Sequence, residues 1–96
     1  MDEPEAVELP IDGVLDLHTF LPREIGMLIP DYLAACRSKG ILQVRIIHGK
    51  GHGILQRRVH SILQKLPEVI YFGLADASGG GWGATTVTLK PLERSP

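Results

Sequence analysis

The chain has 96 residues, and its 10 lysines and arginines nearly balance 11 aspartates and glutamates, giving a net charge of −1. A chain of this length forms one domain with a modest core that needs no disulfide. The single cysteine, Cys36, cannot form an internal disulfide, which is typical of a reducing compartment. No signal peptide or run of 18 apolar residues is visible. We therefore expect a cytoplasmic monomer or weak dimer with no membrane association.

The charges are unevenly distributed along the chain. Residues 32–67 contain no acidic residue, yet they hold seven lysines and arginines and three of the four histidines. Two interpretations remain open, namely solvated helix faces or a polarised surface that binds a polyanion. We expect residues 1–10 to be a disordered acidic N-terminal tail, residues 11–90 to form the domain, and residues 91–96 to be a short C-terminal tail.

The expected elements begin with a strand over 13–18, in which Leu15 and Leu17 alternate with Asp16 and His18. A helix follows over 22–39, because its apolar positions recur at steps of three and four residues. Pro30 cannot donate a hydrogen bond within this helix, so we expect one bent helix or two abutting segments. The β-branched run 41–47 predicts a central strand.

The second half of the chain predicts one more helix and two strands. Apolar positions indicate an amphipathic helix over 55–66, closed by Pro67, and strands are expected over 69–75 and 84–89. The order β-α-β-α-β-β predicts an α/β two-layer sandwich, a four-stranded mixed sheet with two helices on one face. Because two helical crossovers link the first three strands, we expect parallel pairings among them.

The hexapeptide HGKGHG, residues 48–53, joins the second strand to the second helix. Gly49, Gly51 and Gly53 let the backbone turn sharply and approach a ligand closely. The loop leads into a helix N-terminus, where free N–H groups and the helix dipole favour an anion, and Lys50 adds a full charge. The pattern predicts a phosphate site without the spacing of a Walker loop. The alternative is a tight turn that binds nothing.

Three features distant in sequence are expected at one edge of the sheet, because ligands bind outside the carboxyl ends of parallel strands. His18 ends the first predicted strand, His48 ends the second, and the glycine-rich connection leaves the third. Asp16 and His18 are two residues apart on a strand and therefore share a face, with Arg45 beside them. The carboxylate could orient the imidazole; the alternative is a solvated aspartate and a strand-end cap.

The remaining histidines and Trp82 carry weaker signals. A single cysteine and the lack of HExxH or CxxC motifs argue against zinc binding by His48, His52 and His60, so we expect no metal site. His52 is expected to be peripheral, and His60 to lie on the surface of the second helix or partly packed. Trp82 could stack on a base or ribose, or fold back over the core.

Three segments in this order and spacing resemble the Smr (small MutS-related) domain: LDLH at 15–18, VRIIHGKGHGILQRRVHSILQ at 44–64 and GGGWGATTVTL at 79–89. The likeness covers about residues 11–90. It implies a fold resembling the C-terminal domain of bacterial translation initiation factor three, with sheet order 1-2-4-3 and the last strand antiparallel. Members of this family bind or cleave nucleic acid; some nick DNA in a MutS-related context and others cleave messenger RNA at stalled or collided ribosomes.

The resemblance assigns roles residue by residue. The family's Asp-x-His motif falls on Asp16 and His18, and its HGxG motif begins at His48, so these three residues are the expected catalytic set of an endonuclease. The expected phosphate-binding and nucleic-acid-binding residues are Arg45, Gly49, Lys50, Gly51, Gly53, Arg57, Arg58, Gly80, Gly81, Trp82 and Gly83. One departure is Thr19, which stands where many members have glycine and makes the exit of the first strand bulkier.

The substrate determines what else the reaction requires. With RNA, the 2′-hydroxyl is the nucleophile and no cofactor is needed; with DNA, water attacks, and a divalent ion held by Asp16 becomes more plausible. Two imidazoles with pKa values near 7 can hold the opposite protonation states that acid–base cleavage needs. A non-catalytic module that binds the phosphate backbone, and a structural domain without a nucleic-acid role, remain the alternatives.

Overall fold

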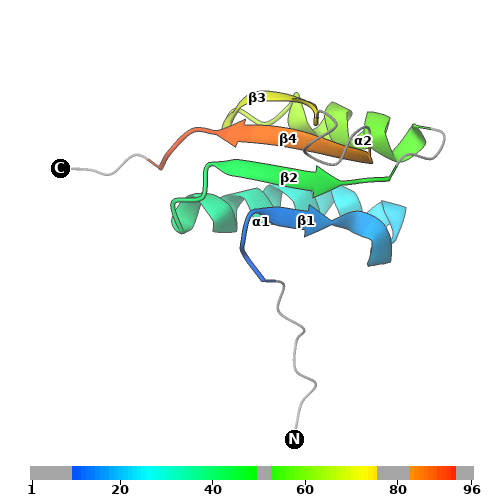
Figure 1. The fold of residues 1–96 in the computed structure, drawn as a ribbon, viewed down its shortest axis with the longest axis horizontal. Helices are drawn as coiled ribbons and strands as arrows, with labels where there is room; N and C mark the ends of the chain where they lie inside the picture. The colour runs from blue at the N-terminus through cyan, green and yellow to red at the C-terminus, as the bar shows by residue number, and fades with distance from the viewer. Residues whose placement is uncertain (1–9, 50–52, 76–82, 93–96) are drawn as a thin grey trace, which may run out of the picture.

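In the computed structural model, the described residues are 10–49, 53–75 and 83–92. The elements in chain order are β1 (Val14–Asp16), a 3-10 turn (Leu17–Thr19), a second 3-10 turn (Pro22–Glu24), α1 (Ile25–Ser38), β2 (Gln43–Ile47), α2 (Ile54–Leu63), β3 (Val69–Leu74) and β4 (Ala84–Leu89). Figure 1 shows them along the chain. The β-α-β-α-β-β order expected from the sequence is confirmed.

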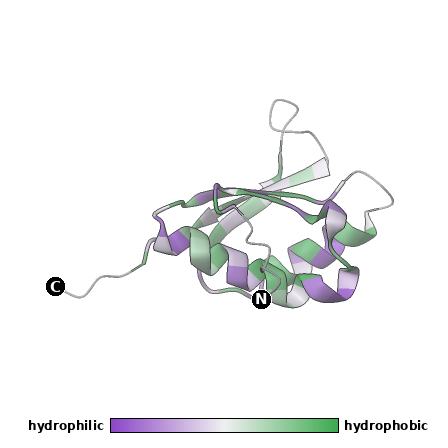
Figure 2. Ribbon diagram, turned by 90° about the horizontal axis from the view of Figure 1, so that it is seen from below, coloured by the Kyte–Doolittle hydropathy of each residue, from purple (hydrophilic) through white to green (hydrophobic). Residues whose placement is uncertain are grey.

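The four strands form one mixed sheet in the order β1-β2-β4-β3. β1 pairs with β2 in parallel, and β4 is antiparallel to both β2 and β3. Both helices lie on one side of the sheet (Figure 2), so the two-layer sandwich is confirmed. β3 runs in the same direction as β2, but β4 lies between them. The strand order 1-2-4-3 with an antiparallel last strand, which the resemblance implied, is therefore confirmed. The direct parallel pairing with β3, expected from the crossovers alone, was wrong.

The hydrophobic core lies between the sheet and the helices. Alternate residues of β2 and β4 point into it, while the intervening residues face the open side of the sheet. The fully buried side chains include Leu15, Val44, Ile46, Val87 and Leu89 from the sheet, and Ile25, Ile29, Leu33, Val59 and Leu63 from the helices. Each such side chain stabilises the fold by roughly 1.5–3 kcal/mol relative to leaving it in water.

α1 continues through Pro30 without a break. If the predicted helix is two abutting segments, they do not meet at Pro30. The boundary lies earlier, where the 3-10 turn Pro22–Glu24 meets α1 at Ile25. Pro30 cannot donate to the carbonyl of Gly26, but Gly26 is exposed, so water can satisfy that oxygen.

In the described ranges, no helix is long and apolar enough to cross a membrane.

Tyr32 connects α1 to the beginning of β1. Its hydroxyl accepts a hydrogen bond from the amide of Gly13 and donates one to the carbonyl of Val14, each at 3.1 Å. Burial, followed by the neighbouring Cys36, raises the pKa of this phenol, so it keeps its proton near neutral pH. The contact fixes the start of β1, the strand that ends at Asp16 and is followed by the turn that contains His18.

Candidate functional site

The register of the parallel pair brings two sequence-distant segments to one edge of the sheet. Asp16, the last residue of β1, lies opposite Ile47, the last residue of β2. The turn that contains His18 follows the first strand, and His48 follows the second. The carbonyl of Gly83 accepts hydrogen bonds from the amides of both His48 and Gly49, each at 2.8 Å. The end of the glycine-rich connection therefore meets the start of HGKGHG.

His18 is not part of β1, which corrects the expectation of a strand over 13–18. The strand ends at Asp16, whose Oδ1 accepts a hydrogen bond from the backbone amide of His18 at 2.9 Å and so caps the 3-10 turn. The two-residue spacing therefore does not place the two side chains on one strand face. Both residues are exposed, which leaves the His18 imidazole accessible at the carboxyl end of β1.

The His48 imidazole is buried and uses both ring nitrogens. Its Nδ1 lies 3.0 Å from the carbonyl oxygen of Gly49, and its Nε2 lies 2.8 Å from the hydroxyl of Thr85 on β4. His48 is 8% exposed and Thr85 is 0% exposed. The side chain therefore lies on the helix side of the sheet, at the end of β2, with the Nδ1 side of the ring against Gly49.

His60 joins the same cluster, and sequence analysis missed this. Its Nε2 lies 2.8 Å from the Thr85 hydroxyl, and its ring centroid is 6.3 Å from that of His48 and 5.0 Å from that of Phe72. Burial lowers the pKa of His60, and the charge of His48 lowers it further. Helical spacing from the core residue Leu63 could have placed His60 on the inner face of α2, but nothing local pointed to Thr85.

The two glycines on either side of residues 50–52 have backbone conformations that other residues rarely adopt. Gly49 has φ +85° and Gly53 has φ +82°, and Gly53 directly precedes α2. Glycine is favoured there because a Cβ is unfavourable in the left-handed region. The predicted phosphate ligands Lys50 and Gly51 lie outside the described residues, as do His52, Gly80, Gly81 and Trp82.

Arg45 lies on the other side of the sheet from the His48 cluster. It is opposite Val14 of β1 and Thr86 of β4 in the register, and it lines a shallow hollow of about 320 Å³ with residues that include Asp12 and Gln43. The open face of the sheet therefore carries one candidate phosphate ligand, on the face that Asp16 also occupies.

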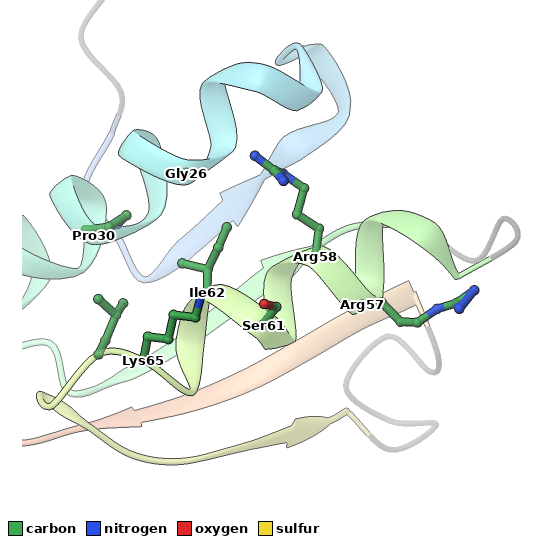
Figure 3. A pocket seen from close by; sticks show the side chains of 8 residues that line it. Gly26, Pro30, Arg57, Arg58, Ser61, Ile62 and Lys65 are labelled. Atoms are coloured by element: carbon green, nitrogen blue, oxygen red, sulfur yellow. The ribbon is translucent and has the colours of Figure 1, made fainter.

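A basic groove separates α1 from α2. It has a volume of about 560 Å³ and is lined by Gly26, Pro30, Arg57, Arg58, Ser61, Ile62, Lys65 and Leu66. Figure 3 shows Arg58 reaching from α2 toward α1, and a Cβ placed on Gly26 would lie 3.8 Å from its Nη2. Arg57 points away from α1. None of these lining residues is acidic, so the groove suits an anion.

Metal binding gains no support from the described ranges, in which no three His, Cys, Asp or Glu side chains are grouped closely enough to hold an ion. The residues at this edge are the buried His48 imidazole, the half-buried His60 imidazole, the Thr85 hydroxyl that they share, and the exposed His18 imidazole in the turn after β1. Such a set can donate and accept protons and can bind an oxyanion.

Comparisons with known proteins agree with this architecture. Residues 15–90 match the model of the Smr domain family. The chain is 32% identical over 80 residues to "Endonuclease MutS2" of Clostridium tetani (strain Massachusetts / E88), and 38% identical over 76 residues to the protein of the same name from Carboxydothermus hydrogenoformans. These alignments cover 83% and 79% of this chain but 10% of each relative, so the chain spans about a tenth of their length.

Two solved structures share the fold. The Smr domain of Thermus thermophilus MutS2 superposes with a TM-score of 0.77 at 30% identity, covering 83% of this chain and 100% of that one. YdaL, a stand-alone small MutS-related protein from Escherichia coli, gives a TM-score of 0.69 at 26% identity, covering 81% of this chain and 64% of that one. The family match over 15–90 and the shared fold lead to one conclusion: this chain belongs to the Smr domain family.

Proposed function

We propose that this Smr domain binds nucleic acid and cleaves phosphodiester bonds at the sheet edge where β1 and β2 end. The observation that carries the proposal is the register Asp16 opposite Ile47, which puts the exposed His18 and the buried His48 on neighbouring strand ends. The name of the MutS2 relatives, endonuclease, supports the same chemistry. Acid–base cleavage needs two groups that exchange protons on opposite sides of the scissile phosphate.

The reaction with RNA follows from these groups. His18, as the neutral base, takes the proton of the 2′-hydroxyl, the 2′-oxygen attacks phosphorus and the bond to the 5′-oxygen breaks. His48, as an imidazolium, supplies the proton to that leaving oxygen and becomes neutral. Asp16 holds the turn that carries His18 by bonding its amide. Lys50, with the amides of Gly51 and Gly53, stabilises the negative charge that develops on the phosphoryl oxygens, whereas the Gly49 amide donates to the Gly83 carbonyl. With DNA, water is the nucleophile and Asp16 would hold a divalent ion.

Nucleic-acid binding is assigned to two basic areas around this edge. Arg57 and Arg58 lie in the first turns of α2, and Arg45 lies on the open face of the sheet. We assign phosphate contacts to these three side chains, and base or backbone contacts to Gly80, Gly81, Trp82 and Gly83. The lack of acidic residues from 32 to 67 supports an attraction for polyanions across this surface.

A specific observation also favours the second candidate function, a binding module that performs no cleavage. Both ring nitrogens of His48 are engaged by protein groups, Gly49 and Thr85. A phosphate must replace the Gly49 carbonyl at Nδ1 before this imidazole can take part in chemistry. A binding module would need no such exchange, and its affinity would come from Arg57, Arg58 and the loop amides.

A cleavage assay separates the two functions. Labelled single-stranded RNA and nicked or branched DNA are incubated with the chain, with and without EDTA. We expect EDTA-resistant RNA cleavage that falls at least about 10²-fold in His18→Ala and in His48→Ala, while Lys39→Ala, at the far end of α1, cleaves like the parent. If the chain binds these substrates and cuts none, the nuclease proposal fails and the binding module stands.

A further inference from the structure

Thr85 supplies one hydroxyl to two histidines at the edge of the core. Its Oγ1 lies 2.8 Å from Nε2 of His48 and 2.8 Å from Nε2 of His60. A hydroxyl has one proton to donate and two lone pairs that accept. It can therefore donate to only one of the two imidazoles, and the other must donate to it.

The Gly49 carbonyl decides the direction of these bonds. A carbonyl oxygen only accepts, so the 3.0 Å contact with Nδ1 of His48 places a proton on that nitrogen. In the neutral imidazole, Nε2 then carries the lone pair and accepts from Thr85. Because the single hydroxyl proton is used there, His60 must donate to Thr85 through Nε2–H.

We propose that Thr85 and His60 are positioning residues that hold His48 in its Nδ1–H form, with the donor directed toward the carbonyl of Gly49. The chain of donors runs from His60 through Thr85 and His48 to Gly49. For its catalytic consequence the proposal rests on the nuclease function above. It directs Nδ1–H of His48 toward the leaving oxygen and leaves His18 as the base. When Nε2 is also protonated, the imidazolium gives its Nδ1 proton to that oxygen and returns to the neutral ring, and Thr85 accepts from Nε2–H while the ring is charged.

Burial and packing favour this arrangement. Thr85 is fully buried and His48 nearly so, so a misdirected hydroxyl would leave a buried nitrogen without a partner, at a cost that is large in a low-dielectric site. Burial also lowers the pKa of His60, which keeps that ring neutral near pH 7. Phe72 packs against the His60 ring at 5.0 Å between centroids and holds its orientation.

NMR tests the tautomers without any nucleic acid. Long-range ¹H–¹⁵N spectra of the ¹⁵N-labelled chain at neutral pH should show the Nδ1–H form for His48 and the Nε2–H form for His60. Thr85→Val and His60→Leu should each shift His48 toward a mixture of tautomers. Thr85→Ser and His60→Gln, which keep a hydroxyl and an N–H donor, should restore it, and Thr88→Val, on the open face of the same strand, should change nothing. An Nε2–H form of His48 in the parent chain overturns the proposal even if no variant folds.

Cleavage kinetics test the consequence separately. His60→Leu should lower kcat about 10- to 100-fold with little change in KM, as expected for loss of the group that orients a functional imidazole. His60→Gln should recover most of that loss. Wild-type kcat in a folded His60→Leu chain contradicts the positioning role. If NMR shows the predicted tautomers but the chain cuts no substrate, the hydrogen bonds from His60 through Thr85 to His48 are supported and the nuclease function fails instead.

Discussion

Thr85 and His48 are both buried polar side chains, and they contact each other where the core meets the sheet edge. A buried polar group without a hydrogen bond costs roughly 1–3 kcal/mol. Here the cost is avoided because each group has a partner, and the described side chains contain no buried polar atom without one. The hydrogen bonds fix one rotamer of His48 and one placement of the protons on His48 and Thr85. Apolar side chains at these positions would not do so.

His60 makes the stability of the fold depend on pH. Burial, followed by repulsion from the charge of His48, lowers its pKa in the folded state below the ordinary value of 6.5. Between these two pKa values the unfolded chain binds more protons, so the free energy of unfolding rises with pH in this window. The stabilisation from the half-buried neutral ring is fully present above about pH 6.5 and is lost as the pH falls through the folded-state pKa.

Urea unfolding between pH 8 and pH 5 measures this effect. We expect the parent chain to lose stability below about pH 6.5, with a steeper dependence on pH than His60→Gln, which keeps the donor but does not titrate. Equal slopes for the two chains would show that His60 is neither buried nor coupled to His48 in solution.

The contrast between His48 and its partners shows what a local pattern can reveal about a site. His48 was predictable because it stands in a glycine-rich segment between a buried strand and a helix. Thr85 and His60 were not, because the contacts that give them a role join positions 37 and 25 residues apart along the chain. A threonine in the segment ATTVTL reads as an ordinary strand residue until the order of the strands is known.

At the scale of elements, the loop into α2 depends on the backbone at Gly53. Its φ of +82° suits glycine, and a Cβ there would meet no atom within 4 Å. The cost of Gly53→Ala is therefore purely conformational, and we expect it to lower the free energy of unfolding by about 1–2 kcal/mol. Thermal or urea unfolding checks this value.

Gly26 provides a matched control for that substitution. It lies within α1, and a Cβ there would approach Nη2 of Arg58 only to 3.8 Å. Gly26→Ala should therefore stabilise the chain by about 0.4–1 kcal/mol, because it restricts the unfolded state without strain in the folded one. A loss of stability in both variants would mean that the left-handed conformation at Gly53 does not determine the effect.

The spacing of apolar residues predicted the bounds of a helix or strand well where packing against the core alone determines where it ends. The bounds of β4, Ala84–Leu89, agree with the prediction, whereas α2 ends at Leu63 rather than near Leu66. The first strand ended early because the Asp16 carboxylate accepts a hydrogen bond from the amide of His18 and favours a turn over continued pairing. The position of β4 between β2 and β3 did not follow from the pattern of apolar residues, since either strand order would bury the same faces; the family resemblance supplied it.

At the scale of the whole molecule, α2 links the sheet edge to the basic groove. Its inner face carries His60, which reaches Thr85, while its first turns carry Arg57 and Arg58, and Lys65 follows just after it. A nucleic-acid strand that occupies the groove would thus continue along the same helix that positions the His48 cluster. The two-layer fold makes this possible because both helices lie on one side of the sheet (Figure 2).

The groove leads to a prediction about salt. If Arg58 and Lys65 contact phosphates of a single strand, the logarithm of affinity should fall with the logarithm of salt concentration, by a slope of about 0.7 for each contact. Arg58→Gln and Lys65→Gln should each reduce the slope by about that amount and weaken binding evenly across sequences. Fluorescence anisotropy with a labelled oligonucleotide at several salt concentrations measures both quantities.

Lys39→Gln is the matched control, because it removes the same charge at the C-terminal end of α1, outside the groove. If net charge alone controlled association, this variant would weaken binding as much as Lys65→Gln does. A groove that contacts phosphate directly instead gives a smaller slope in Arg58→Gln and Lys65→Gln and an unchanged slope in Lys39→Gln, because only direct contacts release counterions from the strand. The difference between the two lysine variants therefore decides whether α1 and α2 form the path of the nucleic acid.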